Sequence, residues 1–78
     1  MIALFSVINS TDKSVVEEFD IDVSEDRERL ADYGVNPTEL AQGDTFEFGA
    51  DEAAEFADDF GLDVSAPAGF HAKLVKPN

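Results

Sequence analysis

The sequence contains no cysteine, and only five of its 78 residues are lysine or arginine. Without cysteine the chain can form no disulfide, no thiolate metal site and no thiol nucleophile. Eighteen aspartates and glutamates outweigh the five bases and give a formal net charge of -13. Because such a surface repels phosphates, direct binding to nucleic acid or to an anionic membrane is disfavoured.

Features typical of exported or membrane proteins are also missing from the sequence. No apolar run reaches the roughly 18 residues of a membrane span, and no basic segment precedes the apolar N-terminal stretch, so we predict neither a span nor a signal peptide. Hydrophobic residues make up 44 % of the chain, a share typical of globular rather than disordered proteins. We therefore predict one small acidic domain over residues 1–78, located in the cytoplasm.

Candidate catalytic and metal-binding residues are few. The single histidine, His71, lies in a predicted strand, and we interpret it as a strand position rather than a general base. No glycine-rich loop is present to bind phosphates. Residues 20–24 begin like a calcium-binding loop, but Glu25 and Ala31 stand where that loop needs glycine and a bidentate glutamate. We predict a non-enzymatic protein with no metal and no cofactor.

Hydrophobic patterning predicts four strands, at residues 2–8, 15–23, 44–48 and 70–75. In the second strand Glu17 is the one polar residue on a side otherwise expected to face the core through Val15, Phe19, Ile21 and Val23. The acidic residues of that strand then point to solvent: Glu18, Asp20 and Asp22.

Capping signals predict the helices. Ser24 is a plausible N-cap for a helix that runs through Tyr33, and Asn36 with Pro37 predicts a helical turn through residue 42, although an irregular loop there remains an alternative. Asp51 is expected to cap a third helix over residues 52–60, whose apolar stripe is Ala53, Phe56, Ala57 and Phe60. The predicted fold class is α+β, a roughly four-stranded, largely antiparallel sheet with two or three short helices packed on one face. The strand order is not predicted.

The acidic residues are concentrated in one part of the chain. Seventeen of the 18 lie between Glu17 and Asp63, where the only bases are Arg27 and Arg29. On the third helix, Glu55 and Asp59 repel one another at the i,i+4 spacing, which costs about 0.2–0.5 kcal/mol. Acids near that helix's C-terminus also oppose its dipole. Locally unfavourable charge without local compensation indicates a functional surface.

The candidate partner-binding residues therefore form two groups. The group that we favour joins the third helix to the strand before it: Glu47, Asp51, Glu52, Glu55, Asp58 and Asp59. The other group is the acidic row of the second strand: Glu18, Asp20 and Asp22. The two groups would lie on opposite layers if the helices cover the apolar side of that strand.

In size and charge the whole chain resembles the small acidic phage-encoded inhibitors that mimic DNA, the anti-CRISPR and anti-restriction proteins. The resemblance involves no motif, so no residue role is transferred. It implies a non-enzymatic inhibitor that binds a basic nucleic-acid-binding protein or complex of the host, in the host cytoplasm if the protein is phage-encoded. Carboxylates of this protein would form ion pairs with the arginines and lysines of the partner that otherwise bind phosphates.

Two further interpretations remain open, besides an acidic partner that neutralises a basic toxin or regulator, which the sequence cannot separate from a DNA mimic. An acid-rich, lysine-poor surface is also typical of proteins adapted to multimolar salt. In addition, residues 43–62 are similar to a strand–turn–helix segment of small phage structural proteins, which implies a virion or assembly protein. Folding only in molar salt would indicate the first alternative, and self-assembly would indicate the second.

Overall fold

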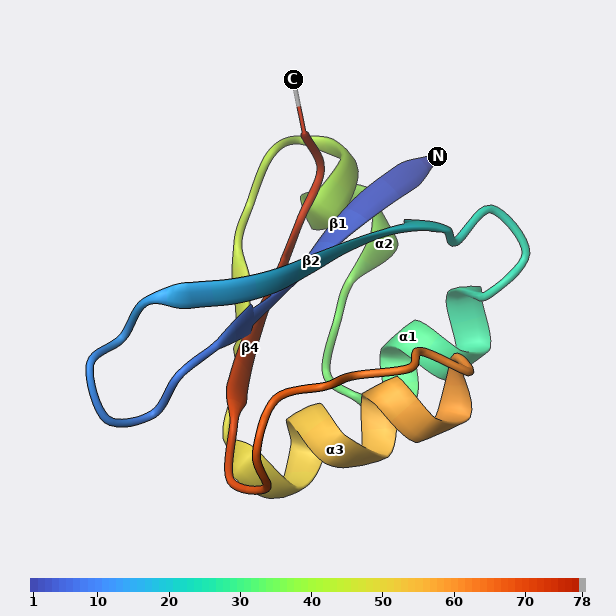
Figure 1. Cartoon of the computed structure of the whole chain (residues 1–78). Coiled ribbons are helices and arrows are strands. Elements are labelled where there is room, and N and C mark those ends of the chain that lie inside the picture. The colour runs from blue at the N-terminus through green and yellow to red at the C-terminus, as the bar shows by residue number, and fades with distance from the viewer. Residues whose placement is uncertain (78) are drawn as a thin grey trace.

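The structure, a computed structural model, describes residues 1–77 and contains four strands and three helices (Figure 1). The strands form a single antiparallel sheet in the order β2-β1-β4-β3. The predicted α+β class is therefore confirmed. Along the chain the elements are β1 (Ile2–Ile8), β2 (Val15–Asp22), α1 (Arg27–Asp32), α2 (Pro37–Ala41), β3 (Phe46–Phe48), α3 (Ala50–Asp59) and β4 (His71–Val75).

The central strand β1 organises the sheet. Ala3, Phe5 and Val7 alternate along it and are fully buried on the side that the helices cover. Phe5 lies opposite Phe19 of β2 and opposite Leu74 of β4, so all three strands contribute apolar side chains to this inner face. The period of two along each strand places the intervening residues on the outer face.

A single hydrophobic cluster joins the inner face to all three helices, which contribute Leu30, Leu40 and Phe56. The ring of Phe56 stacks on Phe5 at a centroid distance of 5.0 Å and on Phe60 at 4.2 Å. Tyr33 meets Phe56 edge-on at 5.1 Å. The predicted apolar stripe of the third helix is thus confirmed, and α3 lies below the sheet beside α1 in Figure 1.

The helix boundaries differ in part from the prediction. α2 begins as predicted, because the Asn36 side chain accepts hydrogen bonds from the backbone amides of Thr38 and Glu39. Ser24, however, is not an N-cap: α1 starts at Arg27 after Asp26, since the Ser24 hydroxyl donates to the Asp22 carboxylate instead. The helical interpretation of the segment after Asn36 is confirmed.

The third helix begins before Asp51, which was predicted as its cap. Gly49 is the N-cap, and its carbonyl accepts the amide of Ala53 at 2.8 Å, so Asp51 falls within the first turn. There its carboxylate still interacts favourably with the helix dipole. The predicted end is confirmed: Gly61 follows the C-cap with a φ of +67°, a conformation that glycine adopts without steric cost.

The second strand is irregular at its start, and this overturns one expectation. Val7 pairs with Glu17, whereas Ile8 pairs with Val15, so Val16 is an extra residue in β2. Such a β-bulge interrupts the alternation of side chains. Val15 was expected in the core but is 56 % exposed, while Ile21 and Val23 are buried as predicted and Phe19 packs against the core.

Candidate protein-binding surfaces

The nine candidate acids do not form one surface. Glu18, Asp20 and Asp22 extend along β2 on the outer face of the sheet, where all three are exposed. We call them the β2 acid row. The exposed acids of α3 lie opposite its buried stripe, on the far side of the helix layer, and we call Asp51, Glu52, Glu55, Asp58 and Asp59 the α3 acid face. The sheet and its core separate the two surfaces.

Glu47 was grouped with the third helix, but it lies on the outer face of the sheet. Phe46 and Phe48 point inward on either side of it, and its cross-strand partner is Lys73. Glu47 also borders a shallow hollow that Lys13, His71 and Lys73 line. Glu47 therefore lies near two lysines without forming an ion pair in residues 1–77, and the outer face is negative at β2 and mixed in charge at β4 and β3. The alternation of side chains along β3 places Glu47 on the outer face of the sheet. The predicted grouping with the third helix relied only on closeness in sequence.

The C-terminus of α3 is compensated by a distant arginine. The Arg29 guanidinium, which comes from α1, donates a hydrogen bond to the Asp59 carbonyl at 3.4 Å and lies 5.3 Å above the ring of Phe60. A cation at this position opposes the negative end of the helix dipole. The sequence predicted only a lack of local compensation within the helix, and this contact adds a distant one: Arg29 of α1 offsets the helix end at the Asp59 carbonyl, while the Asp59 carboxylate forms no ion pair in residues 1–77.

Asp59 has a second structural role. Its carboxylate accepts a hydrogen bond from the Tyr33 hydroxyl at 3.3 Å. Burial, followed by the charges of Asp59, Glu55 and Asp32, raises the pKa of Tyr33 above its usual value. At neutral pH the phenol is protonated and can donate this bond. Asp59 is consequently engaged within the domain, while Asp51, Glu52, Glu55 and Asp58 have no ion pair among residues 1–77.

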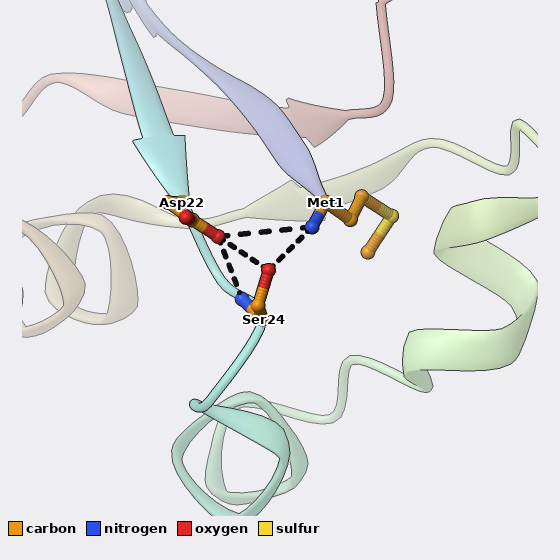
Figure 2. Close-up of polar contacts among 3 residues, drawn as sticks. All are labelled: Met1, Asp22 and Ser24. Carbon is orange, nitrogen blue, oxygen red and sulfur yellow. Dashed lines mark hydrogen bonds and ion pairs between the residues drawn. The ribbon is translucent and has the colours of Figure 1, made fainter.

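The β2 acid row is anchored at one end only. The Asp22 carboxylate accepts hydrogen bonds from the hydroxyl and the amide of Ser24, which lowers the pKa of Asp22. The terminal amine of Met1 contacts the same group, 3.7 Å from the Asp22 carboxylate (Figure 2). At the other end Glu18 has one long contact, 3.4 Å from the Ser6 hydroxyl. Asp20 has no ion-pair or hydrogen-bond partner within the described part of the chain.

Glu17 has a structural role that the sequence did not reveal. Its side chain accepts hydrogen bonds from the backbone amides of Ser65 at 2.7 Å and Ala66 at 3.0 Å. This carboxylate holds the loop between α3 and β4 against the inner side of β2. The isolated acid on an apolar strand face was the only signal in the sequence, and it did not identify residues 48 positions away as partners.

Beside this loop lies a shallow groove of about 390 Å³. Its apolar lining comes from Val16 of β2 and from Ala66, Pro67 and Phe70 of the loop. Glu17 also borders the groove, but its carboxylate is occupied by the two loop amides. The groove is mixed in character, because the polar residues Asn9, Ser10 and Thr11 line it as well.

In residues 1–77, no three or more carboxylate or histidine side chains come together in a group able to hold a metal ion. The same part of the chain has no helix of the length and apolarity needed to cross a bilayer.

No protein family, curated protein or solved structure matches the chain.

Proposed function

We propose that this protein is a non-enzymatic inhibitor that binds a basic nucleic-acid-binding protein or complex of a host cell, in the manner of the anti-CRISPR and anti-restriction proteins that it resembles. Its carboxylates would take the place of phosphates in the partner's binding groove. The proposed site of action is the host cytoplasm. The partner is defined by its chemistry: lysines and arginines arranged to contact a polyanion.

One observation carries this proposal. Although the chain has 18 acidic residues, only two ion pairs form among residues 1–77, Arg29 with Asp26 and the Met1 amine with Asp22. The negative charge is therefore displayed rather than neutralised internally. Association with a basic partner would be accelerated by electrostatic steering and would weaken steeply as salt is added.

The arrangement of the acids supports a compact partner-binding patch rather than a uniformly charged surface. The lysines near the outer face, Lys13 and Lys73, border the hollow beside β4 and β3, so the β2 acid row retains its negative field. The α3 acid face is a second, separate negative surface. One partner groove can engage only one of these surfaces at a time.

The proposal is tested by affinity capture from bacterial lysate at about 0.1 M salt, where charges are screened beyond roughly 10 Å. We expect retention of one basic DNA- or RNA-binding protein that elutes with increasing salt. The same protein should be displaced by DNA or RNA, because both ligands use the same groove. Retention of no such protein, or of a protein that nucleic acid does not displace, would contradict the proposal.

A further inference from the structure

The outer edge of β2 is an unoccupied side of the sheet. β2 is the terminal strand in the order β2-β1-β4-β3, and eight residues form it. In the described residues, no backbone hydrogen bond joins β2 to any segment other than β1. The opposite edge, β3, is only three residues long. The domain therefore has one edge long enough to accept another strand.

The phase of the β1–β2 ladder determines which peptide groups face that edge. The Val23 amide donates to the Met1 carbonyl at 3.0 Å, so Met1 and Val23 form a hydrogen-bonded pair. Hydrogen-bonded pairs recur at every second residue of an antiparallel ladder. Glu17, Phe19 and Ile21 consequently bond to β1, and the peptide groups that point outward belong to Glu18, Asp20 and Asp22.

The β2 acid row and the free peptide groups thus belong to the same residues. In an added antiparallel strand, the residues whose peptide groups bond to this edge would have their side chains on the outer face. Their Cβ atoms would lie about 5 Å from the Cβ atoms of the acidic residues opposite them. Lysine or arginine fits there. The intervening side chains would point toward the inner side, where the groove at the start of β2 offers apolar contacts from Val16, Pro67 and Phe70 next to the polar turn residues 9–11.

We propose that the β2 edge is a strand-addition site for an extended basic segment in which lysine or arginine alternates with apolar residues. The partner's charge rests on the function proposed above. A second copy of this chain does not fit, because antiparallel self-pairing about Asp20 would place Glu18 opposite Asp22 and Asp20 opposite itself. Like charges directly opposite one another destabilise a strand pair.

The test uses a synthetic probe, a capped seven-residue peptide in which lysine and valine alternate, beginning and ending with lysine. Two methylated versions have the same charge. N-methylation of the lysines blocks the amides that would bond to β2, whereas N-methylation of the valines blocks amides that point away from it. We expect the first to weaken binding about tenfold or more and the second about threefold or less.

A matched pair of protein variants tests the acidic contribution. Glu18→Gln with Asp20→Asn removes two charges from the β2 acid row, and Glu52→Gln with Glu55→Gln removes two charges from the α3 acid face. Both variants have the same net charge, so steering by the overall field is equal. We expect the first pair to weaken peptide binding about tenfold and the second about twofold.

Equal binding of the two methylated peptides would overturn the strand-addition site and leave the charge-based function intact. Self-association of the protein through β2, detected as a dimer with protected amides at Glu18 and Asp20, would also overturn it. Conversely, discrimination between the peptides would support the site even if capture from lysate retains no basic nucleic-acid-binding protein. The failures of the two proposals are therefore distinguishable.

Discussion

The two acidic surfaces of this domain differ in how they are tied to the rest of the molecule. The α3 acid face belongs to a helix whose other side holds Phe56 in the core, and its last acid, Asp59, is engaged by Tyr33 and flanked by Arg29. The β2 acid row lies on an edge strand and is anchored only at Asp22. Unfavourable charge on a helix can thus be offset by tertiary contacts, whereas an open edge retains its charge and its free peptide groups.

The largest effect is expected from Phe56→Ala, which removes the ring that joins α3 to the sheet. Loss of a buried phenylalanine costs about 3–5 kcal/mol, a large part of the stability of a domain this small. Urea denaturation followed by circular dichroism should show a large decrease in the midpoint. Ala54→Ser, on the exposed side of the same helix, is the control.

The same experiment on the unmodified chain addresses salt adaptation. A cooperative transition in dilute buffer is expected for a domain with one continuous core. A transition that appears only in molar salt would indicate a haloadapted protein instead. The negative charge of the two surfaces would then no longer support partner binding.

Glu17→Ala should have the next largest effect, because it leaves the amides of Ser65 and Ala66 without their acceptor. For this partly exposed pair of charge-assisted bonds we expect a loss of about 1–2 kcal/mol. Amide hydrogen exchange should accelerate at Ser65 and Ala66. Glu18→Ala, which changes the neighbouring acid, should cost less than about 0.5 kcal/mol, and equal losses in the two variants would refute the role of Glu17.

Arg29→Ala should destabilise the domain by about 1 kcal/mol, since it removes the cation at the end of α3 and its contact with Phe60. Arg27→Ala is a control with the same charge change, because the Arg27 side chain forms no hydrogen bond or ion pair in residues 1–77. Its effect should stay within about 0.5 kcal/mol. Indistinguishable denaturation curves for the two variants would mean that Arg29 does not stabilise the C-terminal end of α3.

The smallest effect concerns alkaline pH. Because the pKa of Tyr33 is raised in the folded state, the stability linked to this proton is fully present below the unfolded pKa of about 10. It is lost as the pH rises through the higher folded value. Asp59→Asn should lower the pKa of Tyr33, as followed by phenolate absorbance, whereas Asp58→Asn should leave it unchanged. A lower Tyr33 pKa in both variants would show that the summed negative charge nearby raises this pKa, and not the specific contact between Asp59 and Tyr33.

Local patterns were sufficient for much of the fold. Asn36 and Pro37 defined the start of α2, the stripe containing Phe56 defined the buried side of α3, and Gly61 defined its end. These features depend on neighbours within one or two turns of the chain. The alternation in β2 likewise placed the β2 acid row on the solvent side.

What could not be predicted depends on distant contacts or on competing local bonds. Arg29 meets Asp59 across 30 positions, and Glu17 meets Ser65 across 48, so no short pattern connects them. The bulge at Val16 shifts the pairing register without a distinctive residue. Ser24 could cap a helix or bond to Asp22, and only the folded structure selects between these bonds.

The position of the only tyrosine gives the domain a built-in optical reporter. The chain has no tryptophan, so its fluorescence and its longest-wavelength absorption come from Tyr33. That ring lies edge-on to Phe56 and Phe48, and its hydroxyl contacts Asp59. Any event that moves α3 away from α1 will change the emission and the near-ultraviolet dichroism of this residue. A ligand seated on the far side of the sheet will leave both signals nearly constant, so an unlabelled sample can distinguish which side is occupied.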